Sequence, residues 1–245
     1  MLELKNISFQ VADEKDEKGI LDDVSFTLDD NKFIVITGPN GGGKSTLARV
    51  IAGIEKPTSG RIFWDGEDIT DMSITDRARL GISYAFQQPV RFKGVTVLDL
   101  IRLAAGEQLS VAGACKYLSE VGLCAKDYIN REVNASLSGG EIKRIEIATV
   151  MARKTRVAVF DEPEAGIDLW SFQNLIHVFE QMHDQLHGSI LIISHQERIL
   201  NIADEILVIA DGRLVKHGAK EEILPGLLGT DSAASFGCSQ IEKRC

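Results

Sequence analysis

The sequence predicts an α/β fold in which a helical segment interrupts an alternation of strands and helices. A short apolar run at 33–37 is followed by a glycine-rich loop and by the helical pattern of 47–52, which together form one strand–loop–helix unit. A second apolar run, 156–160, ends in two carboxylates. Between these units, residues from about 90 to 155 carry helical periodicity with few strand signals. We therefore expect one α/β domain over 1–228 with a helical lobe inserted at about 90–155.

The remaining elements follow in order along the chain. Half-buried strands begin at Leu2 and continue over 24–28, on either side of a mixed-charge turn at 13–19, and their alternation predicts an antiparallel β subdomain. Further strands are expected at 61–64, 81–86, 189–194, 205–209 and 213–216, the last two around the hairpin turn Asp211-Gly212. Helices are expected at 97–105, 111–121, 141–153 and 169–186. Residues 229–245 are small and polar, so we expect a flexible tail.

The glycine-rich loop, 38–46, reads Gly-Pro-Asn-Gly-Gly-Gly-Lys-Ser-Thr and matches the phosphate-binding pattern G-x-x-x-x-G-K-[ST]. Such a loop points backbone N–H groups at an anion, and the dipole of the following helix adds positive potential. The alternative is a glycine-rich turn with an unrelated lysine, which the flanking strand and helix disfavour. The sequence thus predicts binding of ATP and Mg²⁺, with Lys44 on the phosphates and Ser45 on the cation. The candidate binding residues of the loop are Gly38, Asn40, Gly41, Gly43, Lys44, Ser45 and Thr46.

Two carboxylates end the second apolar strand. Asp161 is placed to hold Mg²⁺ beside the phosphate-binding loop, and Glu162 to act as general base on an attacking water. Alone, such a strand end would more often be a surface terminus. Its presence in the same chain as the loop favours a site that hydrolyses ATP, with Lys44 and Glu162 as catalytic residues.

Composition narrows the class of protein. The chain has 245 residues, of which 44% are hydrophobic, enough for one large domain. Its formal net charge of −9 argues against nucleic acid as a partner. Because no apolar stretch is long enough to span a bilayer and the N-terminus lacks a signal-peptide layout, we expect a cytoplasmic protein without direct membrane insertion. The four cysteines show no C-x-x-C spacing, and we expect free thiols.

Residues 137–141, Leu-Ser-Gly-Gly-Glu, open the helix expected at 141–153. Ser138 and Glu141 fit a capping box, and a well-capped helix start would by itself explain them. Gly139 and Gly140 also leave backbone N–H groups free to meet a second anion.

This order of motifs resembles the ABC-type ATPases over about residues 1–225. Gln87 matches the family's Q-loop glutamine, which contacts Mg²⁺, and His195 matches the switch histidine at the γ-phosphate, so the resemblance adds both as catalytic residues. Asp168 matches the D-loop. In this family two subunits enclose two ATP molecules, so a second copy of the chain is an expected partner and the free chain is expected to be monomeric. The resemblance implies that Ser138, Gly139 and Gly140 contact the ATP bound by the partner subunit.

The chain departs from the family pattern at the adenine. By register that position is Val11, where family members usually carry an aromatic residue that stacks on the base. Phe9 is two residues away and faces the same side of a regular strand. Stacking on adenine is therefore expected to be weaker here.

Within the family, the chain resembles SufC, the ATPase of the SUF system for iron–sulfur cluster assembly. Four stretches carry this likeness, together with the extra acid Glu164: 84–90, 94–95, 138–144 and 194–200. The resemblance implies a SufB/SufD-like scaffold protein as partner, on which the cluster is built. A nucleotide-binding subunit of a membrane transporter shares every catalytic motif and is the main alternative. A nucleotide-gated clamp is a second, which the absence of a second cassette or a long coiled-coil insert disfavours.

Two hypotheses concern particular side chains. Lys143 pairs with Glu162 in the free subunit and keeps the base from water, or else it is a solvated surface residue. Val90, Phe92 and Val95 lie in a loop bounded by proline and glycine, where apolar side chains are hard to bury. They form a dock for the scaffold, or else Phe92 folds back into the helical lobe.

Overall fold

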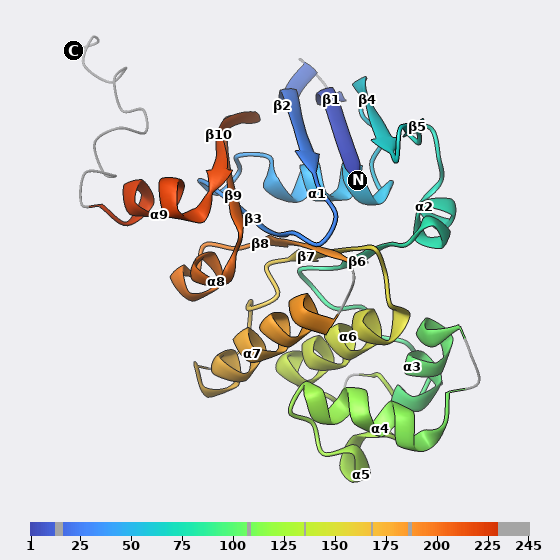
Figure 1. The fold of residues 1–245 in the computed structure, drawn as a ribbon. Coiled ribbons are helices and arrows are strands. Elements are labelled where there is room, and N and C mark those ends of the chain that lie inside the picture. The colour runs from blue at the N-terminus through green and yellow to red at the C-terminus, as the bar shows by residue number, and fades with distance from the viewer. Residues whose placement is uncertain (13–16, 107–108, 135, 168, 186–187, 230–245) are drawn as a thin grey trace, which may run out of the picture.

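The computed structural model describes residues 1–245 apart from 13–16, 107–108, 135, 168, 186–187 and 230–245. Its elements are layered (Figure 1): an antiparallel sheet lies over helix α1 (Lys44–Ala52), α1 covers one face of a six-stranded sheet, and larger helices cover the other face. The expected α/β fold with an antiparallel subdomain and an inserted helical lobe is confirmed. The expected tail lies, from residue 230 on, outside the described residues.

The six-stranded sheet brings the two chemical motifs to one edge. Its strand order is β10-β9-β3-β8-β7-β6, and every neighbouring pair is parallel except β9 and β10. The carboxyl ends of β3 and β7 therefore lie one strand apart at the same edge, where ligands bind in parallel sheets. The strands are β3 (Phe33–Thr37), β6 (Ile82–Ala85), β7 (Val157–Asp161), β8 (Ser189–Ile193), β9 (Glu205–Ala210) and β10 (Arg213–Ala219).

Both faces of this sheet are buried, which explains the unbroken apolar runs of its strands. Phe33 and Val35 of β3 pack into the cluster on the side of the large helices, whereas Ile34 and Ile36 pack toward α1 and the antiparallel sheet. All four side chains are fully buried. The central strands are thus fixed from two sides, and so are the loops that follow them.

The antiparallel sheet has the order β2-β1-β4-β5. Asp65 and Gly66, at the turn between β4 and β5, have φ of 50° and 87°, the left-handed pair that tight hairpins require. The ladder from β1 to β2 continues to the pair Ala12 and Glu17, so the expected turn at 13–19 is shorter than its charge suggested. The strands are β1 (Leu2–Ala12), β2 (Glu17–Leu28), β4 (Ser59–Trp64) and β5 (Glu67–Asp68).

The helices of the insert agree closely with the periodicity of the sequence. They are α3 (Val97–Ala105), α4 (Val111–Glu120), α5 (Ala125–Tyr128) and α6 (Gly139–Arg153), and the later helices are α7 (Leu169–Gln185), α8 (Glu197–Ile202) and α9 (Lys220–Leu228). Before the insert lies α2 (Ile74–Leu80). The sequence pattern missed α2, α5 and α8, which have four to seven residues and show too few turns for an apolar period. It also missed the nine-residue α9, whose interior Pro225 argues against a helix.

One buried cation joins α2 to α1. Arg77 is 1% exposed, and its guanidinium donates to the carbonyl oxygens of Val50 and Ile51 at the end of α1 and of Ile69 and Thr70, at 2.7–2.9 Å. Burial lowers its pKa to about 10, which still leaves the group charged at pH 7. It satisfies carbonyls that the end of a helix leaves without partners.

We expect Arg77→Ala to lower the free energy of unfolding by about 3 kcal/mol, because four carbonyl oxygens lose their hydrogen bonds to the guanidinium. Arg79→Ala is the matched control on the same helix, since Arg79 is 75% exposed and pairs only with Asp76; it should change stability by less than about 0.5 kcal/mol. Urea unfolding measures both. Equal effects would show that Arg77 contributes no more than a surface side chain.

Candidate functional site

The phosphate-binding loop between β3 and α1 needs glycine at two positions. A Cβ at Gly38 would lie 2.0 Å from the carbonyl oxygen of Ile209, and one at Gly43 would lie 2.7 Å from that of Ile20. Both glycines also have positive φ, 131° and 100°. The loop is therefore pressed against β9 on one side and β2 on the other, which fixes its backbone.

Lys44 lies inside this loop. Its side chain is buried, and its ammonium donates to the carbonyl oxygens of Gly38 and Pro39 at 2.7 and 2.8 Å. Burial lowers the pKa of Lys44, while the carboxylates of Glu162 and Asp161 act against that shift. The arrangement holds a positive charge at the N-terminus of α1, where an anion is already favoured.

Asp161 ends β7 and is 1% exposed. Its Oδ1 accepts a hydrogen bond from Ser45 Oγ at 2.9 Å, and its Oδ2 accepts one from the Tyr84 hydroxyl at 2.8 Å. Burial, and next the neighbouring carboxylate, raise the pKa of Tyr84, so the phenol keeps its proton and donates. The structure thus brings together Ser45 and Asp161, two of the three residues that the sequence analysis assigns to Mg²⁺, and adds a tyrosine that the sequence analysis missed.

The chemistry of this pair suits Mg²⁺. Among the described residues, Asp161 has no ion pair within 4.0 Å, although buried carboxylates are normally paired or bound to a metal. The described part of the chain also offers no group of three His, Cys, Asp or Glu side chains that could hold an ion by themselves. Mg²⁺ is commonly held by only one or two protein oxygens together with phosphate oxygens and water, and Ser45 and Asp161 supply two such protein oxygens.

Glu162 follows with a strained backbone. Its φ is 46°, a left-handed value that costs free energy for any residue other than glycine, and strain of this kind gathers at functional sites. Its N–H donates to the carbonyl of Ile193 on β8 at 3.1 Å, which holds the turn in place. Gln87 Nε2 donates to Glu162 Oε2 at 2.6 Å. The candidate base and the Q-loop glutamine are therefore in direct contact.

The expected pair between Lys143 and Glu162 is wrong, and so is its alternative of a solvated lysine. Lys143 is 1% exposed, and its ammonium donates to the carbonyl oxygen of Phe86 and, at 3.4 Å, to that of Gln87. Its charge lies 3.5 Å from Glu146, one turn along α6. Burial lowers the pKa of Lys143, and the carboxylate of Glu146 opposes this shift. The lysine thus binds the backbone that carries Gln87 instead of binding the base.

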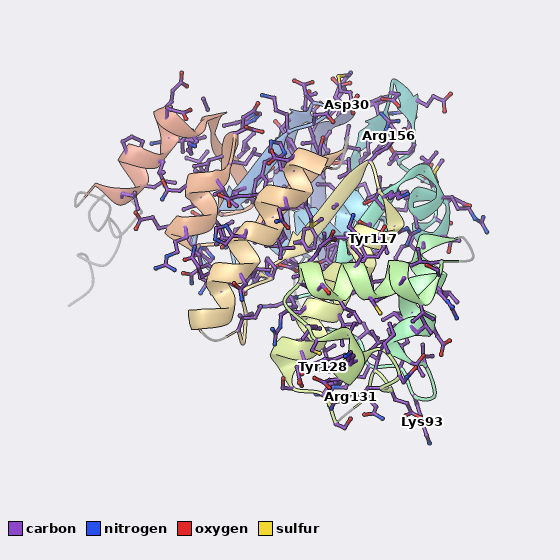
Figure 2. All side chains as sticks on the ribbon, turned by 60° about the horizontal axis from the view of Figure 1, so that its bottom comes forward. Asp30, Lys93, Tyr117, Tyr128, Arg131 and Arg156 are labelled. Carbon is purple, nitrogen blue, oxygen red and sulfur yellow. The ribbon has the colours of Figure 1, made fainter. Side chains whose placement is uncertain are left out.

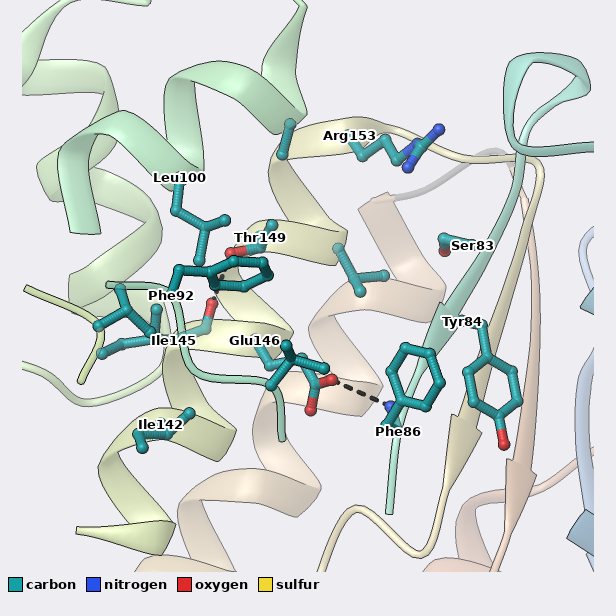
Figure 3. Close-up of a pocket in the computed structure, with 14 residues that line it drawn as sticks. Ser83, Tyr84, Phe86, Phe92, Leu100, Ile142, Ile145, Glu146, Thr149 and Arg153 are labelled. Atoms are coloured by element: carbon teal, nitrogen blue, oxygen red, sulfur yellow. Dashed lines mark hydrogen bonds between the residues drawn. The ribbon is translucent and has the colours of Figure 1, made fainter. Parts of the chain in front are cut away.

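Glu146 completes this contact. Its Oε1 accepts a hydrogen bond from the backbone N–H of Phe86 at 2.9 Å (Figure 3). One side chain of α6 therefore holds the N–H of Phe86 and another holds its carbonyl. Helix α6 therefore fixes the N–H and the carbonyl of Phe86, the residue directly before Gln87 of the Q-loop.

His195 follows β8, between the ends of β3 and β7. Burial lowers the pKa of His195, and so does the positive charge of Lys44. The imidazole ring therefore lies within the electrostatic influence of the phosphate-binding loop. The preceding Ser194 is fully buried and donates to Glu164 Oε1 at 2.5 Å, while its own oxygen accepts from the N–H of Gln196 at 3.0 Å. Glu164 thereby holds the turn that presents His195.

An open pocket collects most of the predicted nucleotide residues. Gln87 and Glu162 face the phosphate-binding loop across it, and its residues beyond those predicted are Lys18, Gly19 and Ile20 of β2 and the turn Asp211-Gly212. The hairpin signal had marked that turn, but not its closeness to the loop. The predicted residues that line the pocket are Asn40, Gly41, Gly43, Lys44, Ser45, Thr46, Gln87 and Glu162.

The signature residues are not part of this pocket. Ser138 caps α6 as expected: its Oγ accepts from the N–H of Glu141 at 3.3 Å, and its own N–H donates to Glu141 Oε2 at 2.7 Å. The Tyr128 hydroxyl also donates to Glu141 and, with these bonds, lowers its pKa to about 2. Arg131 lies over the Tyr128 ring, 5.2 Å from its centroid (Figure 2). Beyond its chain neighbours and its own helix, no atom of the described residues lies within 4 Å of a Cβ built on Gly139, so the helix start is open. Asp168 lies outside the described residues.

Val11, the residue that the family register predicts at the adenine, lies on the surface. Val11 is 43% exposed and lines a shallow pocket that shares Thr46 with the nucleotide pocket. Phe9 and Ile20 line it too. Phe9 is partly buried against the core beneath the antiparallel sheet, and it is the aromatic residue that shares this pocket with Val11.

Comparison with known proteins identifies the family. The model of the family described as "ABC transporter" matches residues 21–165, and the chain belongs to that family. It is an ATP-binding ATPase of the ABC class. An uncharacterized ABC transporter ATP-binding protein of Methanocaldococcus jannaschii is 40% identical over 212 residues, 83% of this chain and 84% of its own length. A probable ATP-dependent transporter, ycf16, of Cyanophora paradoxa is 31% identical, covering 90% of this chain and 89% of its own.

Solved structures agree on the fold. The ATP-binding cassette MJ0796, in a dimeric post-hydrolysis state bound to ADP and Pi, superposes with a TM-score of 0.80 at 22% identity, covering 90% of this chain and 99% of that one. A bacterial Atm1-family ABC exporter with ATP bound superposes with a TM-score of 0.79 at 26% identity, covering 95% and 40%. In the described part of this chain, none of the helices has the length and apolar character needed to cross a bilayer.

We expect Glu162→Gln to bind ATP but to hydrolyse it on the order of 10²–10⁴-fold more slowly, because the water loses its base. Lys44→Ala should instead weaken ATP binding, since the loop loses its buried charge. Turnover and fluorescent-nucleotide binding, measured on both variants, separate the two effects. Wild-type turnover in Glu162→Gln would remove Glu162 from the chemistry.

Proposed function

We propose that this chain is the ATPase subunit of a cytoplasmic iron–sulfur cluster assembly complex of the SufC type. Two copies close around two ATP molecules, and the closure moves a scaffold protein bound to the helical lobe. The observation that carries the proposal is how the SufC-like stretches of the sequence contact one another. Lys143, from the stretch after the signature, binds the carbonyls of Phe86 and Gln87 in the stretch 84–90. Glu164 binds Ser194 in the stretch 194–200.

These contacts give the likeness a structural meaning. A lysine buried to 1% exposure at this position needs the carbonyls of the Q-loop and a carboxylate one turn later. A carboxylate at Glu164 needs a donor such as Ser194. The residues that set the chain apart from the general ABC pattern therefore depend on each other in pairs. Such paired residues are expected to occur together in one functional group of proteins.

The catalytic steps follow from the positions of the side chains. Lys44 and the N–H groups of the loop bind the β- and γ-phosphates. Ser45 and Asp161 would hold Mg²⁺, which when bound neutralises charge on the phosphates. Glu162 accepts the proton of the attacking water, and Gln87 orients Glu162 through its amide.

An apolar groove beside the Q-loop is the proposed scaffold dock (Figure 3). Phe86, Val90 and Phe92 are 37–45% exposed along it, large fractions for apolar side chains that lie together. Phe92 lies against Leu100 of α3 in this groove, and its N–H donates to the carbonyl of Val133 at 2.8 Å. The loop is thus tied to the helical lobe, as the alternative reading of Phe92 expects, while the ring stays partly exposed and available to the proposed partner.

Of the three apolar residues predicted to form the dock, Val90 and Phe92 line the groove and Val95 does not. Val95 is half-buried and does not line the groove, because its carbonyl accepts from the N–H of Val133 within the helical lobe. Arg153 lines the groove. Arg91 and Lys93 are the exposed neighbours of Phe92 in the sequence, so this part of an acidic chain carries cationic side chains. A scaffold segment with apolar side chains flanked by acids would complement it.

Membrane transporters remain the second candidate, on the specific ground that the relatives carry transporter names. The two candidates differ in what occupies the groove. Co-expression with a SufB-like scaffold, followed by affinity purification, should recover a complex without detergent under the proposal. If the chain does not bind the scaffold and instead co-purifies with a membrane subunit in detergent, the result would favour the transporter.

We expect Phe92→Asp to weaken scaffold binding by about 30-fold, corresponding to at least ~2 kcal/mol for loss of an interface anchor. ATP affinity should stay unchanged, because Phe92 lies outside the nucleotide pocket. The matched control is Leu103→Asp on α3, where the side chain is 84% exposed and lies outside the groove. Scaffold binding that survives Phe92→Asp in a folded protein would place the dock elsewhere.

We expect the chain to be monomeric without nucleotide and to dimerise when Glu162→Gln is mixed with ATP. The net charge of −9 on each copy opposes approach until ATP bridges the phosphate-binding loop and the partner's signature. Light scattering with and without ATP measures the change in mass. A stable dimer in nucleotide-free solution would contradict the ATP-dependent closure.

A further inference from the structure

We infer that the Tyr84 hydroxyl is a positioning group for the Mg²⁺ site, which fixes the carboxylate of Asp161 in the orientation that holds the cation together with Ser45. The inference rests on the Mg²⁺-dependent ATP binding that forms part of the proposed function. No contact of Tyr84 with nucleotide or cation is implied. The residue acts through Asp161.

The sheet register explains why a tyrosine is needed. Strands β6 and β7 are parallel neighbours, and Tyr84 is paired with Val159, two residues before Asp161. Two residues of strand measure about 7 Å, which a short hydroxyl side chain would not span. The phenol reaches along β7 to the end of the strand and places its hydroxyl 2.8 Å from Asp161 Oδ2.

The two donors on Asp161 divide its oxygens between them. Ser45 Oγ donates to Oδ1 and Tyr84 donates to Oδ2, so only one rotation of the carboxylate satisfies both. The Ser45 hydroxyl donates its hydrogen bond to Asp161, which leaves the lone pairs of Ser45 Oγ free for a cation. Without the phenol, Oδ2 has no other side-chain donor among the described residues, and a carboxylate buried to 1% exposure is free to turn.

The ring of Tyr84 is held on its other side. Its plane meets the ring of Phe86 edge to face, with centroids 4.9 Å apart and an interplanar angle of 77°. Both rings line the apolar groove, and Figure 3 shows the Tyr84 hydroxyl directed away from it. The phenol is therefore fixed by packing at one end and by Asp161 at the other, as outer-sphere partners of metal ligands commonly are.

The test is Tyr84→Phe, which removes one oxygen and keeps the ring. Binding of a fluorescent ATP analogue is titrated against Mg²⁺, and again in EDTA. We expect the Mg²⁺ concentration for half-maximal binding to rise about 10-fold, the usual scale for losing an outer-sphere partner. Binding in EDTA should match the wild type, and turnover should recover at saturating Mg²⁺. Electron paramagnetic resonance of Mn²⁺ bound with ATP gives a second readout, independent of turnover.

Tyr117→Phe is the matched control, since it makes the same chemical change on the partly buried Tyr117 of α4, outside the nucleotide pocket. It should leave every reading unchanged. An unchanged Mg²⁺ requirement in Tyr84→Phe would overturn the inference, as would an equal loss of binding in EDTA, because the hydroxyl would then support the loop as a whole. If wild-type binding itself ignores Mg²⁺, the failure belongs to the proposed function.

Discussion

The parallel alignment of three buried strands governs every chemical group of the site. β3, β8 and β7 lie side by side and are apolar on both faces, so none can shift along its neighbour without exposing core side chains. Their carboxyl ends present Lys44, His195 and Asp161 in turn. A nucleotide bound at this edge meets groups whose spacing is set by sheet hydrogen bonds, while Gln87 reaches the same pocket from the loop after β6.

A second constraint connects this edge to the helical lobe. The ion pair of Lys143 and Glu146 is buried, and a buried pair is stabilising only when its remaining hydrogen-bonding groups are satisfied. The N–H of Phe86 binds Glu146 Oε1 and the carbonyl of Phe86 accepts from Lys143, so breaking the pair would also release the start of the Q-loop. The helical lobe and the strand edge that binds ATP therefore share one set of polar contacts.

Much of this could be predicted from the sequence, and the limits are physical. The loop at 38–46 and the acids after β7 follow local rules of strand, turn and helix. The partners of Lys143 and Tyr84 do not, because they lie 57 and 77 residues away and depend on which strands become neighbours. Charge alone suggested Glu162 for Lys143, whereas the packing of α6 against β6 gave it carbonyl oxygens and Glu146. The helices α2, α5 and α8 were missed because one or two turns carry no period, and α9 because it contains Pro225.

The left-handed backbone of Glu162 has an evolutionary consequence. At φ 46° a glycine would relieve about 1 kcal/mol of strain, so the most stable version of this turn is one that lacks the carboxylate. Selection for stability alone would remove the base, and only selection for turnover retains it. Copies of this gene that lose the need to hydrolyse ATP should therefore drift at this position early, toward glycine, asparagine or aspartate, while the buried strands beside it stay unchanged.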